Sequence, residues 1–386
     1  MPNLACLAAA LVSVMLIVLM LIDSFETVML PRRVTHPYRL ARMFYRAAWR
    51  IWRSLSALIV SPRRRQTFFS VFGPLSILTL FSIWVAGLIA GFAMLGWSLD
   101  VVLTSPEGRS LTLFTYFYLS GVTFFTLGFG DVTPLETGGR LISVIEAGIG
   151  FGFLALIISY LPVLYQAFSR RELMISLMDA RMGSPPSAGK FLSRVAQSGQ
   201  WQAIDPFLAE LERWSAELLE SHLSFPVLTF YRSQHDNQSW LATLTAILDT
   251  CALLIAGTKE AGLYQAQLTF AMARHAAVDL ALVLQTPPIF GESGRFSPDR
   301  WQQLKAELEA AGMPVREGPA AEHKFAELRG MYEPFVAALS LWFRYDLPEV
   351  FPERTAVDNW QTSAWMRRTA GIGELAALDA VDDHFD

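Results

Sequence analysis

Three long apolar runs, more than any other feature, restrict what this chain can fold into. They extend over Leu4–Ile22, Phe68–Trp97 and Leu141–Phe168, and Glu146 is the only charged residue inside them. A helix needs about 20 apolar residues to cross a hydrocarbon core of about 30 Å. The sequence therefore predicts three membrane-spanning helices. The first is predicted to be retained rather than cleaved, because no basic residue precedes it and no small-residue cleavage motif follows it.

The charges divide the chain into two halves of different character. Residues 1–169 contain twelve arginines, no lysine and seven acidic residues, a net charge of +5. Residues 170–386 contain nineteen basic and twenty-eight acidic residues, a net charge of −9. The total of −4 excludes a globally basic nucleic-acid binder, and two cysteines exclude a disulfide framework. We expect a membrane half followed by a half that resembles a soluble protein.

The segment between the first two apolar runs is strongly basic. Residues 31–67 contain ten arginines and no acidic residue. Basic loops stay in the cytoplasm, so we expect this segment inside, the N-terminus outside and the C-terminal half in the cytoplasm, in a protein of the cell membrane. Arg170 and Arg171, directly after the third run, fit the same orientation.

Five of these arginines are spaced three or four residues apart, so a helix would align them in one stripe. One interpretation is an amphipathic helix whose stripe faces the anionic lipid of the inner leaflet. The other, given equal weight, is that the arginines only set the topology. A voltage sensor is disfavoured, because only one span precedes the stripe. The arginine stripe consists of Arg39, Arg42, Arg46, Arg50 and Arg53.

A shorter apolar stretch, residues 111–125, cannot cross the membrane and is predicted to be a re-entrant pore helix. The sequence Thr-Leu-Gly-Phe-Gly-Asp follows it at residues 126–131. Glycines at alternate positions permit positive φ angles, which let successive carbonyl groups face one way. Rings of such oxygens, contributed by several copies of the loop, can replace the hydration shell of a cation. The predicted ion-binding residues are Thr126, Leu127, Gly128, Phe129 and Gly130.

Residues 126–131 resemble the selectivity filter of the potassium-channel family, whose signature is Thr-Val-Gly-Tyr-Gly, often followed by Asp. Leu127 stands in place of the Val and Phe129 in place of the Tyr. The resemblance extends from residue 68 to residue 171, with an outer helix at 68–97 and an inner helix at 140–168. It implies a bacterial-type pore-loop channel with two pore-forming helices per subunit, with K⁺ as the permeant ion. It also implies a homotetramer, since one loop cannot encircle an ion.

Three residues are expected to support the filter: Asp131, Val122 and Glu146. Some family members carry an acid at the position of Val122, so Asp131 is predicted to lack that partner. Phe129 also lacks the hydroxyl with which a Tyr could anchor the filter, and both departures put the strictness of K⁺ over Na⁺ selection in question. Leu127 and Phe129 are expected to pack behind the loop. Glu146 is expected to support the filter through hydrogen bonds or to add negative potential near the pore.

Candidate gate residues lie in the third apolar run. Gly148, Gly150 and Gly152 are predicted either to form a gating hinge or to permit close helix packing. Pro162 lacks a backbone donor, and we expect it either to shape an inner gate or to mark the bend where the chain leaves the membrane.

The C-terminal half carries no recognisable chemistry. Residues 172–199 are predicted to be a linker that begins with a short helical continuation of the third run, and residues 200–386 are predicted to form an α-helical cytosolic domain. No glycine-rich phosphate or dinucleotide motif is present, and the histidines lack metal-ligand spacing. We therefore expect neither enzymatic activity nor a cofactor. A polar cluster at residues 220–236 could bind a ligand, but helix caps and a turn explain it more simply. The predicted helices are Trp201–Leu219, Ser239–Ala256, Ala261–Leu284, Pro298–Ala311, Ala321–Phe343 and Asp358–Arg368.

Together these expectations describe an all-α membrane protein with a tetrameric pore-loop potassium-channel pore domain at residues 68–171. An extra N-terminal transmembrane helix lies within residues 1–30, and the α-helical cytosolic domain follows the pore. The expected function is passive K⁺ conduction, regulated through the cytosolic domain by a ligand or protein that the sequence does not identify. The alternative is a weakly selective cation channel, or a non-conducting membrane sensor or scaffold subunit.

Overall fold

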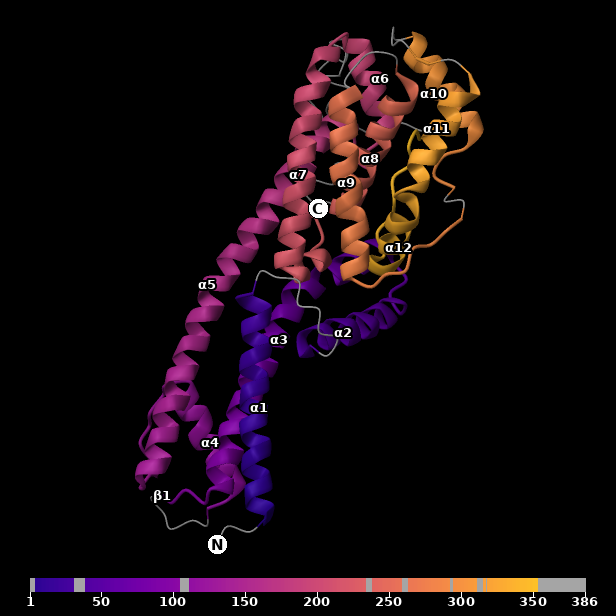
Figure 1. Cartoon of the computed structure of the whole chain (residues 1–386). Helices are drawn as coiled ribbons and strands as arrows, with labels where there is room; N and C mark the ends of the chain where they lie inside the picture. Colours follow the sequence, from indigo (N-terminus) through magenta and orange to yellow (C-terminus); the bar gives the residue numbers. More distant parts are fainter. Residues whose placement is uncertain are drawn as a thin grey trace, which may run out of the picture. The chain divides into compact units, whose positions relative to one another are not determined.

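The computed structural model describes residues 4–30, 39–104, 111–233, 238–258, 263–291, 294–310, 315–316 and 318–352. The chain divides into two compact units, which are described separately below. Unit 1 comprises residues 1–166, and unit 2 comprises residues 167–386. The described part of both units is mostly helical (Figure 1). This confirms the expected all-α class with several apolar helices.

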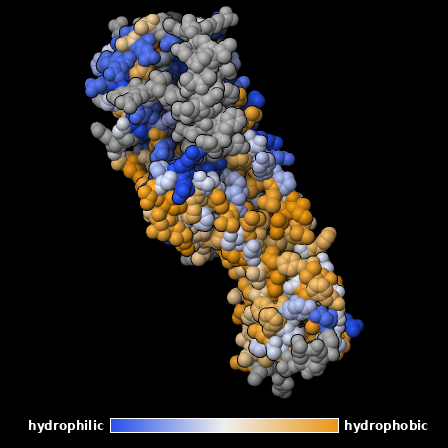
Figure 2. Space-filling model, turned by 180° about the vertical axis from the view of Figure 1, so that it is seen from behind, coloured by the Kyte–Doolittle hydropathy of each residue, from blue (hydrophilic) through white to orange (hydrophobic). Residues whose placement is uncertain are grey.

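Unit 1 contains the predicted membrane helices. The first run lies in α1 (Leu4–Val28), the second in α3 (Pro62–Ser98) and the third in α5 (Thr137–Met182), whose last sixteen residues belong to unit 2. All three are long and apolar enough to cross a membrane. Hydrophobic side chains gather over this unit on the face shown in Figure 2. The basic segment contributes α2 (Leu40–Ser56), and the short apolar stretch forms α4 (Leu113–Phe124).

Helix α1 packs along α3 at two glycines that leave room for its side chains. A Cβ atom on Gly87 would lie 2.7 Å from the sulfur of Met20, and one on Gly91 would lie 2.6 Å from a side-chain carbon of Ile17. Small residues allow membrane helices to approach closely where no hydrophobic effect drives them together. The two glycines of α3 therefore determine where α1 sits.

A buried acid at the end of α1 joins three helices. One carboxylate oxygen of Asp23 accepts a hydrogen bond from the indole Nε1 of Trp84 in α3 at 2.8 Å. The other accepts from the backbone N–H of Ala41 in the first turn of α2 at 3.2 Å. A carboxylate at a helix N-terminus accepts a hydrogen bond from a backbone N–H that has no partner within the helix, and its charge interacts favourably with the helix dipole. We call Asp23, Trp84 and the Ala41 amide the α1–α3 clip.

Helix α2 is held against α3 by aromatic rings. Trp49 is 1 % exposed and packs against Phe69 and Phe72, with centroids 5.5 and 4.8 Å away. Trp52 stacks on Phe68 at 4.3 Å and donates a hydrogen bond to its carbonyl. The aromatic side of α2 therefore faces protein.

Unit 2 is a helical bundle around α8 (Trp240–Gly257), all of whose residues are buried. This helix is long and apolar enough to span a membrane by composition. A helix that is apolar all round can instead form the core of a protein, and neighbouring helices of unit 2 pack on α8 from several sides. The other helices of the unit are α6 (Ala188–Ser198), α7 (Ile204–Ser224), α9 (Leu263–Val283), α10 (Pro298–Ala310), α11 (Pro319–Gly330) and α12 (Glu333–Phe343), with short 3₁₀ turns η1 (Trp201–Ala203) and η2 (Pro226–Phe230).

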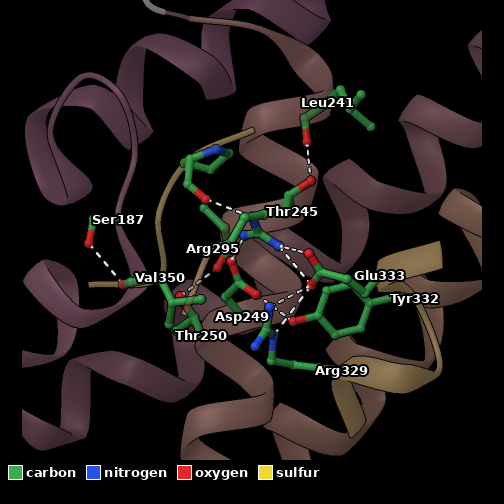
Figure 3. Close-up of polar contacts among 12 residues, drawn as sticks. Ser187, Leu241, Thr245, Asp249, Thr250, Arg295, Arg329, Tyr332, Glu333 and Val350 are labelled. Atoms are coloured by element: carbon green, nitrogen blue, oxygen red, sulfur yellow. Dashed lines mark hydrogen bonds and ion pairs between the residues drawn. The ribbon is translucent and has the colours of Figure 1, made fainter. Parts of the chain in front are cut away.

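A buried ionic cluster fixes α8 to α12 (Figure 3). Asp249 of α8 accepts hydrogen bonds from Arg295 and from the hydroxyl of Tyr332. Arg295 also binds both oxygens of Glu333 at 2.9 Å, and Arg329 reaches the same carboxylate at 3.1 Å. Two carboxylates face two guanidinium groups, so the cluster is balanced in charge. Its role is structural, since removal of one partner would leave an uncompensated buried charge.

The structure differs from the sequence expectation between residues 169 and 199. The inner helix and the short continuation expected after Arg171 form one unbroken helix to Met182, because residues 169–182 are mostly strong helix formers. Gly183, at φ +85°, ends it. The expected linker then contains α6, whose N-cap Ser187 accepts from the Lys190 amide and whose C-cap Gly199 is left-handed.

Two other expectations change or lie outside the described residues. The predicted helix Ala321–Phe343 is two helices, α11 and α12, because Pro334 cannot continue the hydrogen bonding of a helix and starts α12 instead. The predicted helix at residues 358–368 lies outside the described residues, and so do residues 234–237 of the polar cluster.

Candidate functional site

The pore helix α4 ends in a tight hydrogen-bonded turn. The Thr126 N–H donates to the Thr123 carbonyl at 3.0 Å, and the Leu127 N–H reaches back to the Val122 carbonyl at 2.9 Å. Thr126 itself has φ +55°. These are the two bonds of a Schellman motif, with Thr126 at the left-handed position that glycine usually occupies. A β-branched residue is strained there, so the first residue of the predicted filter keeps a conformation that its side chain disfavours.

The two filter glycines adopt the backbone conformation that the sequence predicts for them. Gly128 has φ +60° and Gly130 has φ +78°, so left-handed residues alternate from 126 to 130. A Cβ atom added at either glycine would meet nothing within 4 Å. The demand for glycine therefore comes from the backbone angle and not from a lack of space.

The side chains of the loop are exposed in the single chain. Leu127 is 56 % exposed and Phe129 is 66 % exposed. The sequence predicts that both pack behind the loop, and within one subunit they do not. All of residues 126–130 are exposed, so no other part of the described chain covers the loop.

Asp131 has a hydrogen-bond partner on the pore helix. The hydroxyl of Tyr118 donates a hydrogen bond to a carboxylate oxygen of Asp131 at 2.8 Å. Tyr118 lies one turn before Val122, the position at which an acidic partner for Asp131 is absent. Val122 supports the loop through its backbone carbonyl instead.

Glu146 lies behind the pore helix in a polar junction of three helices. It is 3 % exposed, and its carboxyl group binds the hydroxyl of Ser120 in α4. The same hydroxyl lies 2.9 Å from the carbonyl of Ile89 in α3. We call Glu146, Ser120 and the Ile89 carbonyl the three-helix junction. Glu146 also lines a small cavity with Tyr116 and residues of all three helices. Glu146 is a candidate from the sequence because it is an acid inside an apolar run, whereas Ser120 carries no such signal.

The three candidate hinge glycines have different surroundings. A Cβ atom on Gly150 would lie 2.1 Å from the carbonyl oxygen of Phe124, at the end of the pore helix. At Gly148 and Gly152 it would meet nothing within 4 Å. Gly150 therefore permits close packing. Pro162 lies inside α5, which continues for twenty residues beyond it.

A two-residue antiparallel pair closes the ends of the pore loop. Leu103 and Thr104 of β1 pair with Pro134 and Thr133 of β2, and the two threonine hydroxyls are 2.6 Å apart. The pair joins the chain before the pore helix to the chain after the filter.

Part of the arginine stripe contacts other residues of unit 1 instead of being exposed. Arg39 forms an ion pair with Glu26 at 3.4 Å and donates to the Thr27 hydroxyl. Arg42 is half-buried, and its pKa is lowered by burial and then by the charges of Arg39 and Arg46. Arg50 is exposed and Arg53 is half-buried. In the described residues no group of three or more His, Cys, Asp or Glu side chains could hold a metal ion.

In a comparison with known protein families, residues 76–166 match the family described as ion channel. An uncharacterized membrane protein, YdjJ of Bacillus subtilis (strain 168), is 25 % identical over 47 % of this chain and 52 % of its own length. Protein LctB of Bacillus caldotenax is 36 % identical over 20 % of this chain and 63 % of its own. The chain thus spans about half to two thirds of these relatives, and no solved structure matches it. Residues 76–166, which contain most of α3, the helix α4, the loop at 126–131 and the first part of α5, are therefore similar in sequence to the ion channel family.

Proposed function

We propose that this protein is a K⁺-selective channel, in which four copies of the chain surround one conduction path. The observation that carries the proposal is the alternation of left-handed residues at Thr126, Gly128 and Gly130. Such a backbone can direct successive carbonyl oxygens to one side, where they replace the water around a cation. The ion channel family match at residues 76–166 supports conduction.

The tetramer rests on the incompleteness of one loop. One filter strand covers one side of an ion, so a closed ring needs symmetric copies. The exposed apolar residues of the loop and of α5, such as Phe129 at 66 % and Phe151 at 69 %, favour burial against neighbouring copies and lipid. We propose that these copies provide the packing that Leu127 and Phe129 lack within one chain.

The orientation and the lipid contact belong to the same proposal. The basic segment favours a cytoplasmic position for α2, and this supports an N-terminus outside and unit 2 in the cytoplasm. The outer face of α2 exposes Met43, Ile51 and Leu55 beside Arg50. An apolar face bordered by arginines suits the boundary between the acyl chains and anionic headgroups. Unit 2 then regulates the pore from the cytoplasm.

The test uses the purified full-length protein in liposomes with K⁺ and Na⁺ gradients. We expect a current whose reversal potential follows K⁺, and loss of K⁺ selectivity in Gly128→Ala, because alanine disfavours φ +60°. Gly121→Ala is the matched control, since Gly121 lies inside α4 with open space around it. A reversal potential that follows Na⁺ would contradict K⁺ selectivity.

One specific observation favours a second candidate function. Phe129 has no hydroxyl, so the filter lacks that anchor, although Tyr118 holds Asp131. If K⁺ selectivity or conduction requires that anchor, the protein is a weakly selective cation channel, or a non-conducting sensor or scaffold subunit. Equal K⁺ and Na⁺ permeability would support the first alternative. Intact tetramers without current would support the second.

A further inference from the structure

One arginine of α5 is buried in the bundle of unit 2. Arg171 is 3 % exposed, although it directly follows Arg170, which is exposed on the same helix. A guanidinium group taken out of water must have its donors satisfied, or it destabilises the fold. The groups that accept hydrogen bonds from Arg171 therefore indicate which segments it connects.

Each nitrogen of the Arg171 guanidinium contacts an acceptor. Nη1 donates to the carbonyl of Leu228 at 2.9 Å, and Nη2 donates to the carbonyl of Tyr231 at 2.8 Å. Nε donates to Glu172 at 2.9 Å. The two carbonyls belong to η2 and the residue after it, so Arg171 connects α5 to a segment about sixty residues further along the chain. Charge-assisted bonds of this kind are about twice as strong as neutral ones.

Two side chains of α7 complete the arrangement. The indole Nε1 of Trp214 donates to the backbone carbonyl of Arg171 at 3.2 Å. The Nδ1 of His222 lies 2.8 Å from the Leu218 carbonyl, a contact that requires a proton on this nitrogen. Nε2 is then free to accept from Arg171, whose Nη1 is 3.4 Å away. We call Arg171, Trp214, His222 and the carbonyls of Leu228 and Tyr231 the α5 latch.

We propose that the α5 latch couples unit 2 to the opening of the pore, with Arg171 as its positioning residue. The proposal rests on the proposed channel function. Helix α5 is continuous from Thr137 to Met182, so its first part belongs to the pore and its last part belongs to unit 2. A force on α7 and η2 reaches α5 through the guanidinium group. A residue that served only to fold unit 2 would have no influence on the open probability of assembled channels.

The experiment compares Arg171→Gln with Arg170→Gln in single-channel recordings of the full-length protein in bilayers. Both substitutions remove one positive charge at neighbouring positions of one helix, but only Arg171 belongs to the latch. We expect the ratio of open to closed time to change about tenfold in Arg171→Gln, with an unchanged reversal potential. Arg170→Gln should match the wild type, and Arg171→Lys, which can reach one carbonyl, should restore part of the change.

A second variant keeps the proposal testable if Arg171→Gln does not fold. Trp214→Phe removes one hydrogen bond to α5 and keeps an aromatic ring, and we expect about a threefold change in the same ratio. Amide hydrogen exchange over residues 226–231 should become faster in both latch variants and not in Arg170→Gln.

The possible failures can be told apart. A wild-type protein that carries no current overturns the proposed function, and the coupling proposal falls with it. A wild-type protein that conducts, with Arg171→Gln or Trp214→Phe gating like Arg170→Gln, overturns the coupling proposal alone.

Discussion

At the scale of single residues, the pore helix depends on one hydroxyl group that serves two neighbouring helices. Ser120 contacts both the Ile89 carbonyl and the Glu146 carboxyl group. Water is scarce at this depth, so an unpaired polar group has no replacement partner. The position of the filter thus depends on a side chain that the filter sequence does not include.

We predict that Ser120→Ala destabilises the assembled protein by about 1–3 kcal/mol, because it leaves a buried carboxyl group and a carbonyl without this partner. Thermal unfolding in detergent would measure the change, and recordings should show less stable conduction. Ser82→Ala is the control, since its hydroxyl is exposed and bonds within its own helix. Equal stability of the two variants, together with unchanged conduction in Glu146→Gln, would exclude a supporting role for the junction.

At the scale of elements, the packing of α5 on α4 depends on one glycine of three. We predict that Gly150→Ala disrupts the pore unit, since its Cβ atom would lie 2.1 Å from the Phe124 carbonyl oxygen. Gly148→Ala and Gly152→Ala have space in the single chain, and each should change stability by about 1 kcal/mol or less. Yield of assembled protein and unfolding temperature would check this. Normal assembly of Gly150→Ala would contradict the packing role.

The attachment of α1 gives another prediction at this scale. Trp84→Phe keeps a ring in place but removes the donor to Asp23, and we expect a loss of about 1–3 kcal/mol. Trp97→Phe on the same helix is the control, because Trp97 is 50 % exposed. Unfolding followed in detergent micelles should separate the two variants. If they unfold alike, the clip contributes little.

The sequence predicted the elements better than their connections. The apolar runs predicted α1, α3 and α5, because hydrophobic length is a property of local sequence. The Pro and Gly residues at 183–189 indicate a linker, but the structure contains α6, for which Ser187 and Gly199 are ordinary cap residues. The alternation of φ from 126 to 130 follows from the glycines, whereas the partners Tyr118 and Ser120 required tertiary contacts that no local pattern contains.

At the scale of the whole molecule, the stability of unit 2 should depend on pH through one histidine. Burial lowers the pKa of His222 well below its ordinary value, and the neighbouring Arg171 charge lowers it further. Because the folded protein disfavours the charged imidazole, His222 makes its full contribution to the free energy of unfolding at pH values above the unfolded pKa of about 6.5. As the pH falls below that value, the unfolded chain binds the proton first, and stability decreases by about 1.4 kcal/mol per pH unit.

Unfolding temperatures of unit 2 in the full-length protein at pH 7.5 and pH 5.5 would measure this. His222→Gln should remove part of the pH dependence over this interval. His275→Gln is the control, because the His275 side chain is 60 % exposed and its Nε2 lies 3.5 Å from a carboxylate oxygen of Asp279. A pH dependence that is the same in wild type and His222→Gln would contradict the assignment.

The α1–α3 clip also has a consequence for how the protein is made. Asp23 precedes Trp84 by 61 residues, so at about 5–20 residues per second the ribosome completes α1 about 3–12 seconds before its partner exists. A carboxylate near the membrane interior is expensive to leave alone. We therefore expect the first helix to leave the ribosome early but to reach its final position only after α3 has emerged.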